Sequence, residues 1–194
     1  MAFDAGHLTD GFGRRFRYLR LSVTEVCNFR CTYCLPDGWK RQGPLSFLTP
    51  DEIERLVHGF ARLGLAKVRL TGGEPTVRRD FAEIVARVAA TPGVDKVAVT
   101  TNGWNLNKRV QDWRDAGLTH LNVSLDSLDR DGFRAITGHD RCDDVIRGID
   151  AAMAADFQAI KVNAVLLRET AEAGFDAWAS FVRERPIAVR FIEL

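Results

Sequence analysis

Apolar residues follow two alternating patterns along this chain of 194 residues. Short runs rich in aliphatic and β-branched residues are typical of strands, and longer segments with apolar residues every three or four positions are typical of amphipathic helices. Strands are expected at Tyr18–Thr24, Lys67–Thr71, Lys96–Thr101, His120–Asp126, Ile160–Leu167 and Ala188–Leu194. Helices are expected at Pro50–Leu63, Asp80–Ala90, Leu106–Ala116, Asp143–Ala155 and Phe175–Glu184. This alternation predicts a single α/β domain with a parallel sheet.

The helix predicted at Pro50–Leu63 has the clearest boundaries. Thr49 before Pro50, followed by Glu52, combines an N-cap residue, a proline in the first turn and the glutamate of a capping box. An apolar stripe then continues to Leu63, and Gly64 provides a stop signal.

The predicted strands are apolar on one face and polar on the other. In Tyr18–Thr24, for example, leucine and valine alternate with arginine, serine and threonine. A doubly wound sheet, covered by helices on both faces, would instead show continuous apolar runs. The alternation favours a curved sheet or partial (βα)6 TIM-like barrel, with helices on the apolar face and a polar, ligand-filled lumen.

Basic residues recur on the polar face. They are Arg20, Lys67, Arg69, Lys161 and Arg190. Cations enclosed together need anions to offset their desolvation, and a polyanion such as a triphosphate would provide them. The alternative is that each is a strand-end residue whose charged group reaches solvent.

Composition narrows the class of protein. The net charge of +1 does not suggest a polycation built to bind nucleic acid, and 46% hydrophobic residues suit a globular core. No apolar run is long enough to span a membrane, and Met1–Phe16 lacks the apolar segment of a secretory signal. A cytoplasmic location is therefore expected.

Three of the four cysteines form the motif C-x3-C-x2-C directly after the first predicted strand: Cys27, Cys31 and Cys34. Three thiolates on one short loop can ligate three irons of a [4Fe-4S] cluster and leave the fourth iron open. Structural zinc usually takes four protein ligands, and no fourth cysteine or histidine is nearby. Zinc binding and simple electron transfer remain alternatives. Cys142 and the four histidines show no ligand spacing and are expected to be structural or on the surface.

The cysteine loop after strand one resembles the signature of the radical S-adenosylmethionine (SAM) superfamily. Its flanking segment, residues 18–36, resembles the GTP 3′,8-cyclase family of molybdenum cofactor biosynthesis. The similarity continues through later segments and covers nearly the whole chain. These segments are RLTGGEP (69–75), TTNG (100–103), LNVSLDSL (121–128), ITG (136–138), KVNAV (161–165) and RFIEL (190–194).

The resemblance implies a lyase in which Cys27, Cys31 and Cys34 hold a [4Fe-4S] cluster that binds SAM. Reductive cleavage of SAM would give a 5′-deoxyadenosyl radical, which abstracts the 3′-hydrogen of GTP on the way to 3′,8-cyclo-7,8-dihydroguanosine 5′-triphosphate. Tyr33, Gly73 and Ser124 would line the SAM site. The GTP side of the cavity would be lined by Arg20, Lys67, Arg69, Thr100, Lys161 and Arg190.

The resemblance also implies partners: GTP, an electron donor such as flavodoxin, the downstream cyclic pyranopterin monophosphate synthase, and a second copy in a homodimer. Neither nucleic acid nor a membrane is expected as a partner.

Family members continue beyond the position of Leu194, and their later part carries a second three-cysteine motif and a terminal Gly-Gly. We therefore expect residues 1–194 to form a radical SAM core domain without the second-cluster domain, as a shortened cyclase. SAM cleavage would survive in it. Two alternatives are a stand-alone radical SAM protein acting on another anionic substrate and a non-catalytic metal-binding remnant.

Overall fold

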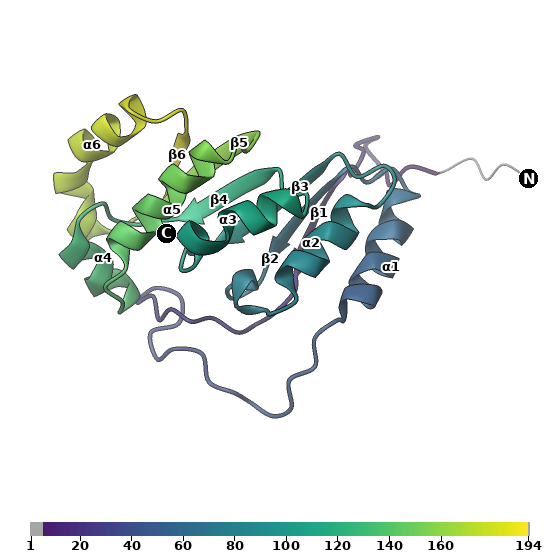
Figure 1. The fold of residues 1–194 in the computed structure, drawn as a ribbon, viewed down its shortest axis with the longest axis horizontal. Helices are drawn as coiled ribbons and strands as arrows, with labels where there is room; N and C mark the ends of the chain where they lie inside the picture. The colour runs from purple at the N-terminus through teal and green to yellow at the C-terminus, as the bar shows by residue number, and fades with distance from the viewer. Residues whose placement is uncertain (1–5, 194) are drawn as a thin grey trace, which may run out of the picture.

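A computed structural model describes residues 6–193 of the chain and shows one six-stranded parallel sheet (Figure 1). The strands lie in chain order, β1-β2-β3-β4-β5-β6, and the ladder leaves β1 and β6 at its two edges. Their bounds are β1 Tyr18–Ser22, β2 Lys67–Thr71, β3 Lys96–Thr101, β4 His120–Ser124, β5 Ala159–Leu166 and β6 Ala188–Glu193. A parallel sheet in this order with helical connections is an open part of a barrel, which confirms the predicted fold class.

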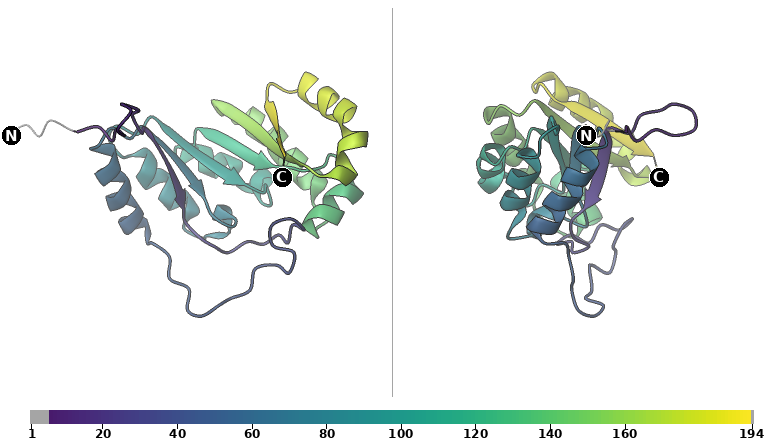
Figure 2. Two further views of the ribbon diagram at one scale, coloured as in Figure 1. Left: turned by 180° about the vertical axis from the view of Figure 1, so that it is seen from behind. Right: turned by 90° about the vertical axis from the view of Figure 1, so that its right-hand side faces the viewer.

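Helices cover one face of the sheet. They are α1 Pro50–Ala61, α2 Phe81–Ala89, α3 Leu106–Asp115, α4 Arg130–Thr137, α5 Cys142–Ala154 and α6 Arg168–Arg183, with a short 3₁₀ turn, η1, at Pro75–Val77. In Figure 1 α2, α3 and α5 lie in front of the strands, and the left view of Figure 2 shows the opposite face without a helix across its centre. The core lies between the helices and the apolar strand face, where Val68, Leu70 and Leu121 are fully buried.

Helix α1 forms because its first turn satisfies its own backbone. The Thr49 hydroxyl accepts from the Glu52 backbone N–H at 3.3 Å, and the Glu52 carboxylate accepts from the Thr49 N–H at 2.8 Å. This is the predicted capping box. Ile53 and Val57 then point into the core.

Several predicted boundaries were wrong by one to two residues, and the helix predicted at Phe175–Glu184 begins earlier, at Arg168. Two strands end early. β1 stops at Ser22 and β4 at Ser124. Beyond β1, Val23 N–H still donates to the Thr71 carbonyl at 2.9 Å, but the Thr24 hydroxyl then accepts from Val26 N–H and turns the chain. Local side-chain to backbone bonds of this kind compete with the strand ladder.

Helix α4 was missed by the periodicity argument, although both of its ends carry recognisable signals. The Asp129 carboxylate caps the N-terminus by accepting from Gly132 N–H at 2.7 Å, and Gly138 ends the helix with a φ of +73°. Its eight residues contain a glycine and are too short for a convincing apolar stripe.

The helices of residues 6–193 include none that is long and apolar enough to cross a membrane.

Candidate functional site

The cysteine loop leaves β1 at the carboxyl end of the sheet and is tied to helix α4. Arg30 N–H donates to the Thr137 carbonyl at 3.2 Å, and Thr32 N–H donates to the Ile136 carbonyl at 3.0 Å. Within the loop, Cys34 N–H donates to the Cys31 carbonyl at 2.9 Å, which forms a tight turn between two of the three cysteines. The loop backbone is therefore held at both sides of Cys31.

Aromatic packing anchors the same loop. Phe29 lies between Cys27 and Cys31 and is buried, stacked on His139 with ring centroids 5.0 Å apart. Trp104 meets the Phe29 ring edge-on at 5.6 Å, and Arg141 lies over Trp104 at 4.4 Å. The motif's variable positions thus include a core residue that fixes the loop onto the fold.

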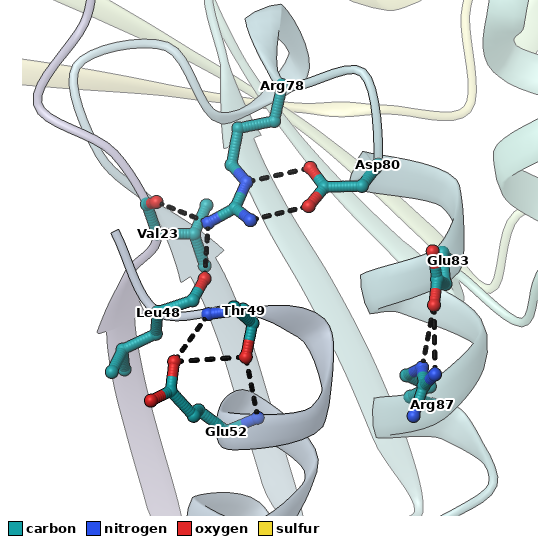
Figure 3. A network of polar contacts seen from close by, with 8 residues as sticks. All are labelled: Val23, Leu48, Thr49, Glu52, Arg78, Asp80, Glu83 and Arg87. Atoms are coloured by element: carbon teal, nitrogen blue, oxygen red, sulfur yellow. Dashed lines mark hydrogen bonds and ion pairs between the residues drawn. The ribbon is translucent and has the colours of Figure 1, made fainter. Parts of the chain in front are cut away.

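Arg78 fastens both ends of the segment that carries the cysteines (Figure 3). One guanidinium nitrogen donates to the carbonyls of Val23 and Leu48, each at 2.9 Å, and the other two nitrogens bond Asp80 at 2.8 and 2.6 Å. The paired guanidinium lowers the pKa of the Asp80 carboxyl. Because Val23 precedes the loop and Leu48 follows it, one side chain closes the base of the whole segment.

Gly72 and Gly73 follow β2 and lie against the backbone that leads to Cys27. A Cβ on Gly72 would come within 2.2 Å of the Thr24 carbonyl oxygen, and one on Gly73 within 2.5 Å of the carbonyl oxygens of Glu25 and Val26. Gly73 N–H donates to Thr24 O at 2.9 Å. The missing side chains of the two glycines therefore leave room for the backbone of the cysteine loop. The role of Gly73 in SAM binding remains a prediction.

Glu74 is fully buried at the carboxyl ends of β2 and β3. Its carboxylate accepts from the hydroxyls of Thr76 and Thr101 at 2.7 and 2.8 Å, and from Asn102 N–H at 2.6 Å. Burial raises its pKa against these donors. The Asn102 side chain in turn donates to the Asn28 side chain at 2.8 Å, so this network reaches the cysteine loop.

Asp126 links the loop to the other side of the sheet. Tyr33 donates its hydroxyl proton to one Asp126 oxygen at 2.7 Å, and Val165 N–H, in β5, donates to the other at 2.9 Å. Burial raises the pKa of Asp126 and of Tyr33. A buried carboxylate with two donors is a rigid attachment point rather than a free base.

The three thiols lie close enough to influence one another's ionisation. Burial raises the pKa of Cys27, with smaller contributions from Glu74 and Cys34. Burial raises the pKa of Cys31 to about 12, with Asp126, Cys27 and Cys34 adding to it. Such thiols ionise when a metal centre supplies positive charge.

The predicted cations lie on the face of the sheet that the helices do not cover. Strand register pairs Arg20 with Arg69 across β1 and β2, and Asn163 with Arg190 across β5 and β6. Burial lowers the pKa of Lys67, and the nearby charges of Arg69, Lys161, Lys96 and Arg190 lower it further. Side chains from four strands therefore form one cationic surface.

Arg69 occupies the middle of this surface and reaches across β3. With the Asn122 amide oriented to satisfy both partners, its oxygen accepts from the two terminal nitrogens of Arg69. In the register Ala98 lies beside Arg69 and Thr100 lies beside Asn122, and Ala98 is buried although it is on the polar face. The Arg69 Nε is buried without a hydrogen-bond partner among the described residues.

The expectation that all five cations are enclosed needs correction. Arg20 and Arg190 are exposed, whereas Lys67, Arg69 and Lys161 are half-buried. Because the partial barrel is open, its edge strands lie in solvent, and only Lys67, Arg69 and Lys161 are partly enclosed by the fold.

The remaining predicted positions lie at or beyond the carboxyl ends of strands. Tyr33 is in the cysteine loop, Gly73 follows β2, Ser124 is the last residue of β4, and Thr100 lies one residue before the end of β3. Sequence reasoning missed the roles of Arg78, Glu74 and Asp126 as attachment points. Glu74 and Asp126 lie within the segments RLTGGEP and LNVSLDSL that resemble the cyclase family, whereas Arg78 lies outside them. The periodicity of apolar residues does not mark a buried polar side chain that connects two segments.

The cysteine loop and the glycine turn lie together at the carboxyl end of an open parallel sheet, the end where barrel enzymes carry their active sites. These features indicate a partial-barrel protein that holds a metal cluster in its cysteine loop. The family model described as "Radical SAM superfamily" matches residues 21–182. The chain therefore belongs to the radical SAM superfamily.

Two curated relatives are similar along most of the chain. A "GTP 3',8-cyclase" of Stenotrophomonas maltophilia (strain R551-3) is 58% identical over 187 residues, which cover 96% of this chain and 57% of that protein. A protein of the same name from Aeromonas hydrophila subsp. hydrophila is 56% identical over 192 residues, covering 96% and 56%. The chain thus spans just over half the length of these relatives.

Solved structures agree in fold. Streptococcus suis SuiB bound to S-adenosylmethionine superimposes with a TM-score of 0.77 at 19% identity, over 91% of this chain and 40% of that one. Methylornithine synthase (PylB) gives 0.70 at 16% identity, over 98% and 55%. At these identities the likeness shows the fold alone.

Superfamily membership implies a [4Fe-4S] cluster and SAM as cofactors, and the described loop fits the cluster. Three thiols stand on one anchored loop, near enough to affect one another's charge, and Cys34 is exposed. In residues 6–193 no group of three or more His, Cys, Asp or Glu side chains is arranged to hold a single metal ion. A cubane differs because it places each thiolate on a separate iron.

Proposed function

We propose that this chain is the radical SAM core of a GTP 3′,8-cyclase, acting in the first step of molybdenum cofactor biosynthesis. The proposal rests on the placement of two features. The cysteine loop lies at the carboxyl edge of the sheet, and the face of the sheet that the helices leave uncovered is cationic. SAM bound at the cysteine loop would lie beside a polyanion bound on the cationic face. The 58% identity to a protein named GTP 3',8-cyclase supports GTP as that polyanion.

In this proposal Cys27, Cys31 and Cys34 hold the cluster, which supplies the electron that cleaves SAM for hydrogen abstraction from GTP. The protein itself binds and orients. Tyr33, Gly73 and Ser124 would surround SAM at the carboxyl ends of the strands. Thr100 would contact GTP from β3.

The triphosphate would lie on Arg20, Lys67, Arg69, Lys161 and Arg190. Guanidinium groups donate in a planar fork that matches phosphate oxygens, and ammonium groups add point charge. Arg69 is held in place by Asn122 and keeps a buried Nε without a partner among the described residues, a donor that a phosphate oxygen could accept from.

Anaerobic reconstitution followed by product analysis tests the proposal. The wild-type chain should bind about four irons per molecule and, with dithionite and SAM, release 5′-deoxyadenosine. With GTP deuterated at the 3′ position, deuterium should appear in the 5′-deoxyadenosine. Zinc in place of iron, or a cluster without SAM cleavage, would contradict the proposal.

Alanine variants give the matched control. Cys27→Ala, Cys31→Ala and Cys34→Ala should each lose the cluster absorbance, whereas Cys142→Ala should retain it. Cys142 is buried at the start of α5, with its sulfur 3.6 Å from the Ser127 carbonyl, and it is not among the groups that shift the pKa of Cys27 or Cys31. SAM cleavage without deuterium transfer from GTP would instead indicate another anionic substrate.

We extend the proposal to the setting of the reaction. Residues 1–194 would act as the core domain in the cytoplasm, reduced by a one-electron donor such as flavodoxin and as part of a homodimer. Their product would pass to a cyclic pyranopterin monophosphate synthase. These statements rest on the family resemblance.

A further inference from the structure

His120 stands on the cationic face, although its sequence spacing suggested only a structural or surface role. It is the first residue of β4, and the register places it beside Ala98 of β3, which in turn lies beside Arg69 of β2. Because alanine is small, the histidine ring and the Arg69 side chain share the space above β3. The ring is half-buried there.

One nitrogen of the ring is committed to a neighbour. His120 Nδ1 lies 2.8 Å from the Thr119 hydroxyl oxygen. We assign the single proton of that hydroxyl to the Val97 carbonyl, 2.9 Å away, so that the hydroxyl accepts from the histidine. With this assignment Nδ1 carries the proton in the neutral ring, and Nε2 is the basic nitrogen.

Among residues 6–193 the Nε2 atom makes no hydrogen bond, and the ring lies near a set of positive charges. The groups that act on the ring are Lys67 and Arg69 from β2, Lys96 from β3 and Lys161 from β5. Burial lowers the pKa of His120 most, and these cations lower it further. In the free protein the ring is thus neutral at neutral pH, and its Nε2 cannot donate to an anion.

We propose that His120 is a further ligand of the polyphosphate on this face, and that Nε2 takes up a proton when the anion binds. This inference rests on the proposed function only in taking a polyphosphate as the ligand. Phosphate charge beside Nε2 would offset the repulsion from the four cations and favour the imidazolium. The protonated Nε2 would then donate a charge-assisted hydrogen bond to a phosphate oxygen.

The sign of the pH dependence follows from this coupling. Anion binding raises the pKa of His120 above its lowered value in the free protein, so protons are taken up between the two values. The contribution of His120 to affinity is complete below the pKa of the free protein and is lost as pH rises through the pKa of the complex. A shift of one pKa unit corresponds to about a tenfold change in affinity.

Two substitutions separate the roles of the two nitrogens. His120→Asn keeps a donor near the position of Nδ1 for Thr119 and removes the group that faces the anion. His120→Gln keeps a neutral amide near the position of Nε2 that cannot titrate. His58→Gln on α1 is the matched control, because His58 lies near Glu54 on the helical side of the molecule.

Calorimetric titration of the full chain with tripolyphosphate and with GTP, in two buffers of different ionisation enthalpy, measures the proton uptake. The wild-type chain and His58→Gln should take up more protons at pH 7.5 than either His120 variant. At pH 6.5 His120→Asn should bind about tenfold more weakly than wild type, and the difference should shrink at pH 8.5. Circular dichroism melting confirms that each variant folds.

Equal proton uptake in wild type and both His120 variants would overturn the inference while leaving GTP binding intact. Histidine-dependent uptake with tripolyphosphate, but no preference for GTP over UTP, would support the inference and count against the proposed substrate. Absence of binding by both ligands would overturn both.

Discussion

Single residues hold the cysteine loop in place by satisfying buried polar groups. Asp126 is the clearest example, because its two oxygens accept from Tyr33 in the loop and from the backbone of β5. Removal of one donor leaves a buried acceptor unpaired, which costs more than the hydrogen bond contributes. Such residues are visible only once the partners are in space.

Tyr33→Phe removes one donor to Asp126 without changing the ring. We expect the free energy of unfolding of the apoprotein to fall by about 1–2 kcal/mol, because Asp126 loses a hydrogen bond in a buried position. Urea unfolding measures it. Tyr18→Phe is the matched control, since the Tyr18 ring contributes stacking with Lys67 and Arg69 that phenylalanine keeps. Equal losses in the two variants would contradict the role of Asp126.

Arg78→Lys keeps the charge and removes the fork that joins Val23, Leu48 and Asp80. We expect a loss of about 2 kcal/mol in unfolding free energy at pH 7, since several charge-assisted bonds are lost. Reconstitution should also load fewer irons per chain. Arg79→Lys is the control, because the neighbouring Arg79 is exposed.

The difference in unfolding free energy between wild type and Arg78→Lys should depend on pH. Asp80 has a lowered pKa in the folded protein, so its pairing with Arg78 stabilises above the ordinary value of 3.8 and is lost as pH falls through the lowered pKa. The gap between wild type and Arg78→Lys should therefore narrow in unfolding experiments below pH 4. A gap that is constant with pH would indicate that Asp80 contributes nothing.

At the scale of elements, the cap of α1 has two consequences. The capping box starts the helix, and it also places Leu48 where Arg78 can bind its carbonyl. The cysteine segment is thus closed by a helix start on one side and a strand end on the other (Figure 3).

Thr49→Ala should lower the unfolding free energy by about 1 kcal/mol, the usual effect of losing an N-cap side chain. Because the Thr49 and Glu52 side chains bond reciprocally, Glu52→Ala and the double variant complete a cycle. We expect the double variant to lose less than the sum of the single changes, as thermal melting can measure. Strict additivity would show that the two bonds do not act together.

For the whole molecule, the cationic face opposes the stability of the protein without its anion. Burial and, to a smaller extent, like charges lower the pKa of Lys67, which means that its charged form is disfavoured in the folded state. For a base with a lowered folded pKa, this destabilisation is complete at neutral pH and disappears only above 10.5.

Lys67→Met should therefore raise the melting temperature of the apoprotein while weakening tripolyphosphate binding. The opposite signs arise because the charge is unfavourable alone and favourable beside phosphate. Lys108→Met on the exposed side of α3 is the control and should change neither quantity appreciably. A stabilised variant with unchanged anion affinity would place the polyanion elsewhere.

Much of the molecule could be predicted from sequence, because the determining signals are local or periodic. The alternation of Leu19 and Leu21 with Arg20 identified the two sheet faces, and Thr49 with Glu52 marked a helix start. The spacing of Cys27, Cys31 and Cys34 indicated a cluster, since three thiolates within one loop need no long-range information.

Tertiary structure decided what depends on distance across the chain. It showed that Gly72 and Gly73 admit the cysteine loop, that Arg78 closes its base, and that Arg20 and Arg190 are exposed at the edges of an open sheet. It also placed His120 among four cations from three other strands. Register and burial set these relations, and neither is encoded in the spacing of residues along one segment.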